Sequence, residues 1–232
     1  MTLLFALFLT YTVTTGTGAA HAADAGNTVD PYKPAMLLTN TGGNEKNELI
    51  KYTVTDGKVT EDSRISLAKG YSDIAISANG TKLYAIGKSP EHNNDLRVWV
   101  LDTDTGEELE EKPVAGLPTD YFPNALTPLQ DGDLLTGTSG DSKVVISELY
   151  RINPETGQAT KFEMSLSEGY GSAGDFLTVS DHEIMAIATH KDQYDSPLES
   201  RLSEALLLDF ETKSVRSLGE VPISYGRRTG QQ

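Results

Sequence analysis

A pattern of short apolar runs and tight turns recurs along this chain about every 50 residues. Tyrosines recur at spacings of 50, 49 and 55 residues, at Tyr71, Tyr121, Tyr170 and Tyr225. Glycines that end similar turns recur at spacings of 49 and 51 residues, at Gly57, Gly106 and Gly157. Self-similarity at a fixed period is typical of repeat architectures, in which each unit buries its apolar face on its neighbours.

The best-preserved unit is Gly70–Leu117, and it contains two hairpin signals. Asn79-Gly80 lies between two apolar runs, and Asp102–Gly106 lies between two more. Glycine suits these turns because it adopts a positive φ without strain. Four short strands in a unit of this length predict an all-β fold, a β-propeller built of four-stranded antiparallel blades.

The period divides the chain into four repeats, at 36–69, 70–119, 120–168 and 169–221. The first repeat has only three predicted strands, and a lead-in at 23–35 precedes it. Residues 222–232 are interpreted as the stub of a further blade. We expect a partial propeller from a larger ring; the alternative is a four-bladed ring in which the stub supplies the missing strand.

The second repeat has a recurring set of residues in its two turns and in the strands beside them: Ser77, Asn79, Gly80, Leu83, Tyr84, Asp102, Thr105 and Gly106. With these residues it resembles the blades of YVTN-type repeat proteins, a branch of the seven-bladed, WD40-like propellers. We expect the Asp or Asn that opens each outer turn to cap that turn with its side chain. The resemblance implies a scaffold and leaves the chemistry open.

The N-terminus carries a targeting signal. Leu3–Val13 is an apolar run too short to span a membrane comfortably, and Ala20-His21-Ala22 is a small-residue cleavage site. Residues 1–22 are therefore expected to be a signal peptide, although no Lys or Arg precedes Lys33. No later stretch has the length of a transmembrane helix. We expect a secreted or cell-surface protein.

The charge balance excludes some partners. The chain has 34 acidic and 19 basic residues and a formal net charge of −15. Nucleic acid and anionic lipid are unsuitable partners, because both need clustered Lys and Arg. The chain has no cysteine, so disulfides and thiolate metal sites are impossible.

In a propeller, the loops between blades and the loops after second strands gather at one mouth of the central channel. This rule gives the candidate ligand-binding residues Tyr71, Asp73, His92, Asp120, Tyr121, Tyr170, Asp175 and His190, with Asp95 in the same loops. Tyrosines and carboxylates suit a polar or cationic ligand, or a basic segment of a partner. The alternative is that each tyrosine packs between neighbouring blades.

Catalytic signatures are weak. Gly169, Gly171 and Gly174 match a dinucleotide fingerprint, but a predicted strand follows where the fingerprint needs a helix. We therefore expect no catalytic residue and no cofactor, and a metal site is undetermined. The favoured hypothesis is a non-catalytic scaffold for a protein, peptide or glycan. The alternatives are a metal-assisted lyase or lactonase and a truncated propeller with no independent function. The oligomeric state is open.

Overall fold

The computed structural model describes residues 35–39, 47–55, 58–77, 80–119, 121–138, 147–166, 169–193 and 203–221. The first sheet contains β1 (Ala35–Thr39), β2 (Glu48–Thr55) and β3 (Lys58–Ser66). The second contains β4 (Asp73–Ile76), β5 (Leu83–Ser89), β6 (Asp95–Leu101) and β7 (Glu108–Pro113). The third contains β8 (Pro123–Pro128), β9 (Leu134–Thr138), β10 (Glu148–Ile152) and β11 (Ala159–Ser165). The fourth contains β12 (Tyr170–Thr178), β13 (Glu183–His190), β14 (Ser203–Asp209) and β15 (Ser214–Val221).

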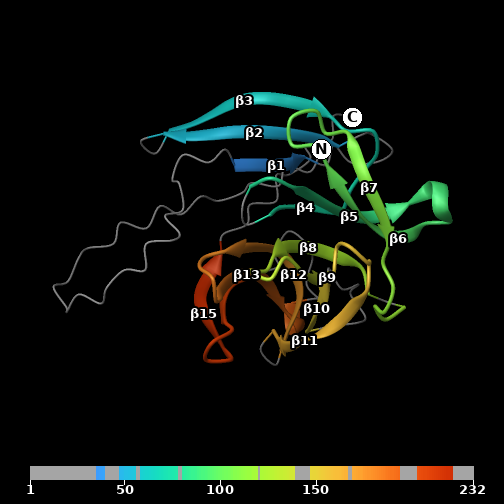
Figure 1. The fold of residues 1–232 in the computed structure, drawn as a ribbon. Helices are drawn as coiled ribbons and strands as arrows, with labels where there is room; N and C mark the ends of the chain where they lie inside the picture. The colour runs from blue at the N-terminus through green and yellow to red at the C-terminus, as the bar shows by residue number, and fades with distance from the viewer. Residues whose placement is uncertain are drawn as a thin grey trace, which may run out of the picture.

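Each sheet is an antiparallel meander, in which every strand pairs with its neighbour along the chain. In Figure 1 the first sheet lies at the top, the second below it, and the third and fourth below the second. The innermost strands β4, β8 and β12 pack in succession. The expected all-β propeller of four-stranded blades is thus confirmed, and the four sheets are called blades 1 to 4 below. In the part of the chain that the structure describes, no helix is long and apolar enough to cross a membrane.

The outer turns are closed by their first side chain, as the sequence predicted. Asp102 Oδ1 accepts hydrogen bonds from the backbone N–H groups of Asp104 and Thr105, at 2.9 and 2.7 Å. These bonds lower the pKa of the Asp102 carboxyl because they stabilise its charged form. Asn153 in blade 3 and Asp209 in blade 4 cap their turns in the same way.

In blades 2, 3 and 4 the last residue of the outer turn lies in the left-handed region of φ. Gly106 and Gly157 have φ values of 70° and 73°, whereas blade 4 places Lys213 there with φ 52°. A Cβ on Gly106 would lie 2.7 Å from Leu67 Cδ2, so any side chain there would force the buried Leu67 to shift. The Lys213 ammonium instead lies 2.6 Å from a carboxylate oxygen of Glu163 in blade 3.

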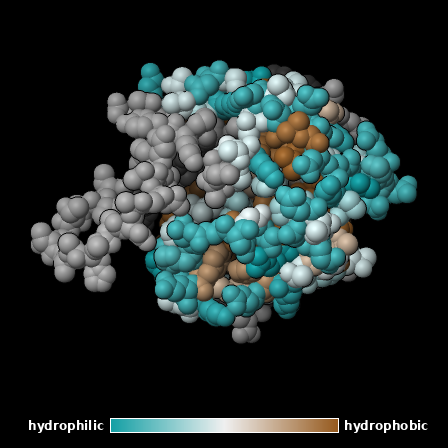
Figure 2. All heavy atoms as spheres, in the orientation of Figure 1, coloured by the Kyte–Doolittle hydropathy of each residue, from teal (hydrophilic) through white to brown (hydrophobic). Residues whose placement is uncertain are grey.

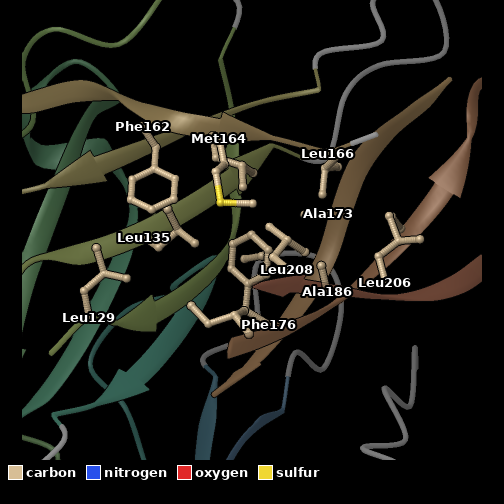
Figure 3. Packing of buried hydrophobic residues seen from close by; sticks show 14 residues of the cluster. Leu129, Leu135, Phe162, Met164, Leu166, Ala173, Phe176, Ala186, Leu206 and Leu208 are labelled. Atoms are coloured by element: carbon tan, nitrogen blue, oxygen red, sulfur yellow. The ribbon is translucent and has the colours of Figure 1, made fainter. Parts of the chain in front are cut away.

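Apolar side chains fill the spaces between blades. Figure 3 shows the cluster between blades 3 and 4, where Phe162 and Met164 of β11 face Phe176 of β12. A second cluster joins blades 2 and 3. A third joins blades 1 and 2 around Trp99, which is fully buried. Each blade is therefore held by its neighbours as well as by its own hydrogen bonds.

Blade 4 differs from blade 2 on the face that points away from the preceding blade. Leu177 of β12 is 55% exposed, Val179 just after the strand is 52% exposed, and Leu218 of β15 is 41% exposed. Ala75 of β4 occupies the position that corresponds to Leu177 of β12. It is only 6% exposed because blade 3 covers it. The face seen in Figure 2 is mostly hydrophilic, with one apolar patch over the second sheet and a smaller apolar area over the lower sheets.

Candidate functional site

Tyr71 and Tyr121 are buried within their own blades. The Tyr71 hydroxyl donates a 2.6 Å hydrogen bond to Glu108 Oε1, and its ring meets Trp99 edge-on at 5.1 Å. The Tyr121 hydroxyl donates to the Thr136 carbonyl at 2.8 Å. Burial raises the pKa of both phenols, because it disfavours the phenolate. The burial and the hydrogen bonds of these two tyrosines are those expected of side chains that pack within a blade.

Tyr170 repeats this arrangement nearer to solvent. Its hydroxyl donates a 2.7 Å hydrogen bond to Glu204 Oε2, and this bond raises the pKa of Tyr170 to about 12. Its ring lies edge-on to His190, with the ring centres 5.0 Å apart. The three tyrosines thus have structural partners, and their contact with a ligand stays a prediction.

Asp73 and Asp175 occupy corresponding positions in the inner strands β4 and β12: Asp73 is opposite Ile86 of β5, and Asp175 is opposite Ile187 of β13. Asp73 Oδ1 accepts the N–H of Ile74 at 2.8 Å, and Asp175 Oδ1 accepts the N–H of Phe176 at 2.8 Å. Asp73 Oδ2 also accepts the N–H of Leu126 in blade 3, at 2.7 Å. This second bond joins two blades through a side chain.

Desolvation raises the pKa of both carboxyls. For Asp73 the rise is large, and the charge of Asp175 adds to it. The charge of Asp175 thus disfavours ionisation of Asp73, whereas burial is what raises the pKa of Asp175. They are structural groups at the inner strands, with hydrogen bonds that hold them to the backbone.

The histidines have separate partners at the loop ends of blades 2 and 4. His92 ends the 3-10 helix η1 (Pro90–His92), and its Nε2 lies 3.4 Å from Glu111 Oε1. His190 ends β13, and its Nδ1 lies 2.5 Å from Oδ1 of Asp192, in the 3-10 helix η2 (Lys191–Gln193). Asp120 lies outside the described residues. Within the described ranges, no three His, Asp or Glu side chains are grouped so that they could hold a metal ion.

A pocket of about 250 Å³ opens between blades 2 and 3 at the same loop end. Its lining combines the end of β5, the start of β6 and the connection to blade 3: Lys88, Asn94, Asp95, Leu96, Val114, Gly116, Leu117, Pro118, Thr119, Tyr121 and Phe122. Two of these residues, Asp95 and Tyr121, were expected at this mouth from the sequence. The structure thus places part of the expected site beside a cavity.

Lys88 and Phe122 are the lining residues that sequence reasoning missed. The Lys88 ammonium lies 4.3 Å from the centre of the Phe122 ring, a cation–π contact between the two blades. Phe122 is 40% exposed, so part of its ring faces solvent beside the pocket. Its position directly after the repeated Tyr121 was the available signal in the sequence.

The lining has the chemistry of a site for a small polar group. Lys88 supplies a cation, Asp95 an anion and Thr119 a hydroxyl, while Leu96 and Val114 supply apolar surface. Ligand sites typically combine apolar walls with a few polar groups that fix orientation. A volume of about 250 Å³ accommodates one side chain or one sugar unit.

Several solved structures are similar to this chain at low sequence identity. A hydrazine synthase from Kuenenia stuttgartiensis is 14% identical, with a TM-score of 0.42, over 76% of this chain and 43% of that one. The WD40 repeats of RRP9 are 13% identical, with a TM-score of 0.42, over 75% and 46%. Virginiamycin B lyase from Staphylococcus aureus is 13% identical, with a TM-score of 0.39, over 83% and 57%.

The chain spans less than two thirds of the length of each of these structures. No protein-family model and no curated protein matches it. The propeller architecture is established by the chain's own sheets, and its activity and partners are matters of proposal.

Proposed function

We propose that this chain is an exported binding scaffold without catalysis of its own, which holds a polar ligand in the pocket between blades 2 and 3. The observation that carries the proposal is the pocket itself, where Lys88, Asp95 and the exposed ring of Phe122 surround one cavity. The ligand is a peptide side chain or a sugar unit presented by a partner. Export is supported by the signal-peptide pattern of residues 1–22.

A binding screen of the secreted chain against peptide and glycan arrays tests the proposal. Hits are then titrated against Lys88→Ala and Phe122→Ala, with Lys58→Ala, an exposed lysine on β3, as the matched control. We expect both pocket variants to weaken binding about tenfold or more and the control to leave it unchanged. Binding that is insensitive to both pocket variants would overturn the pocket as the site. Turnover of a bound ligand would overturn the absence of catalysis.

A further inference from the structure

The face of blade 2 that points towards blade 1 carries a second group of polar side chains, separate from the pocket. Arg97 and Trp99 are two residues apart in β6, so their side chains leave the same face of the sheet. Glu111 of β7 is directly opposite Trp99, and Ser89 of β5 is opposite Asp95. Trp99 belongs to the apolar cluster shared with blade 1, which identifies the face.

Four buried polar atoms on this face have no hydrogen-bond partner among the described residues: Ser89 Oγ, Arg97 Nε, Trp99 Nε1 and Glu111 Oε1. Ser89 and Trp99 are both 0% exposed. An unpaired buried polar atom costs about 1–3 kcal/mol, so native proteins rarely leave one alone. Four on one sheet face indicate that another group completes their hydrogen bonding.

The neighbouring charged side chains do not complete it. Arg97 Nε and His92 Nε2 lie 3.3 and 3.4 Å from Glu111 Oε1, and a charged Arg97 attracts it, but neither nitrogen is aligned for a hydrogen bond to it. The Tyr71 hydroxyl is engaged by Glu108. Lys69 lies over the Trp99 ring, 5.2 Å from its centre, and pairs with Glu108 at 3.0 Å.

The unpaired atoms define the chemistry of the missing group. The Trp99 and Arg97 N–H groups can only donate, and the Glu111 carboxylate can only accept. A guest carboxylate or phosphate would be repelled by Glu111, and a guest ammonium could not accept from Trp99. A neutral hydroxyl oxygen satisfies both requirements, because it accepts and donates.

We propose that this face of blade 2 is a hydroxyl-binding site, in which an oxygen accepts from Trp99 Nε1–H or Arg97 Nε–H and donates to Glu111 Oε1. The site is approached from the Glu111 side, since the side chains of Glu111 and His92 are 25% and 41% exposed whereas Trp99 is fully buried. The hydroxyl comes from an ordered water or from a carbohydrate. Buried waters commonly satisfy such groups.

Trp99 is the only tryptophan in the chain, so the indole N–H gives a single resonance in a ¹⁵N-labelled sample. In the water arm, we expect a nuclear Overhauser effect between this proton and a long-lived water. In the carbohydrate arm, methyl glucoside and glycerol are titrated, with trimethylamine N-oxide as a probe without hydroxyl groups. We expect a saturable shift of the indole proton with the hydroxyl-bearing probes alone.

Glu111→Gln tests the acceptor, and Glu110→Gln is its matched control because Glu110 pairs with Val100 on the opposite face. We expect Glu111→Gln to shorten the water residence time or to weaken the probe about tenfold, and Glu110→Gln to change neither. Ser89→Ala is a second, milder variant in case Glu111→Gln unfolds the chain. If only the nuclear Overhauser effect to water is seen, the bound hydroxyl belongs to a water molecule. If the hydroxyl-bearing probes shift the indole proton, the site takes a carbohydrate hydroxyl. An indole proton that responds to neither overturns the site, as does an equal response in both glutamine variants.

Discussion

Blades 2 and 4 are copies of one repeat in different surroundings. Blade 2 lies between two described blades, whereas the described residues cover blade 4 on one face only. Asp73 in blade 2 bonds to its own strand and to Leu126 of the next blade. Asp175 in blade 4 makes the first bond, to Phe176, and the described part of the chain offers no second one. Asp175 therefore bonds within its own strand, whereas Asp73 also joins blade 2 to blade 3.

We expect the two blades to differ most in the loss of stability caused by a charged residue two positions after Asp73 or Asp175. Ala75→Asp places a carboxylate among apolar side chains between blades 2 and 3, where it has no partner. We expect a loss of about 3 kcal/mol or more in the free energy of unfolding. Leu177→Asp is the matched variant in blade 4, and its change should stay within about 0.5 kcal/mol because Leu177 is 55% exposed. Urea denaturation measures both, and a large loss for Leu177→Asp would mean that the blade 4 face is covered.

The outer turns of the two blades differ in their last residue. Gly106→Ala adds a Cβ only 2.7 Å from Leu67 Cδ2, at a φ that disfavours any side chain. We expect this variant to lose about 2–3 kcal/mol of stability. Lys213→Gly makes the opposite change in blade 4, and relief of left-handed strain should make the protein equally or slightly more stable, by up to about 1 kcal/mol. Thermal melting of the two variants beside wild type gives the comparison. Two losses of equal size would mean that the left-handed geometry differs from that described.

The aspartates themselves give a smaller difference. Asp73→Ala leaves the N–H groups of Ile74 and Leu126 without their acceptor, whereas Asp175→Ala releases only that of Phe176. Removal of the desolvation cost offsets part of each loss. We expect Asp73→Ala to lose about 1–2 kcal/mol and Asp175→Ala less than 1 kcal/mol. Hydrogen exchange at the Leu126 amide provides a local measurement, since it should accelerate in the Asp73 variant alone. Unchanged exchange at Leu126 would contradict the inter-blade bond.

The pH dependence of these aspartates follows from their raised pKa. In the folded chain each carboxyl binds its proton more tightly than in the unfolded chain. The resulting stability is therefore present at low pH and is lost as pH rises through the folded pKa. Relative to Asp73→Asn, wild type should gain stability between pH 7 and pH 4, and Asp175→Asn should show a weaker form of the same trend. Subtracting the variant removes the opposite contribution of Asp102, whose pKa is lowered. A wild-type advantage that shrinks on acidification would contradict the sign.

The repeat and the outer turns were predictable from the sequence because they depend on local chemistry. A turn such as Asp102–Gly106 is specified by its own residues, and its side-chain cap was predicted correctly. The Asp73 bond to Leu126 was not predictable, because it depends on how two inner strands are set against each other. Lys88 and Phe122 were missed for the same reason, since 34 residues separate them and only blade packing joins them. The role of the candidate tyrosines in ligand binding stays a prediction, and their hydroxyl partners could be identified only from side-chain geometry.

The meander order of the sheets has a consequence for how the chain assembles. Every described strand pair joins neighbours along the chain, so each blade can close its hydrogen bonds soon after its last residues are synthesised. Among the described residues, blade 4 packs on blade 3, so we expect it to detach before blades 2 and 3 when the chain is pulled from its C-terminal end. Mechanical unfolding should then proceed in steps of one repeat, beginning at blade 4.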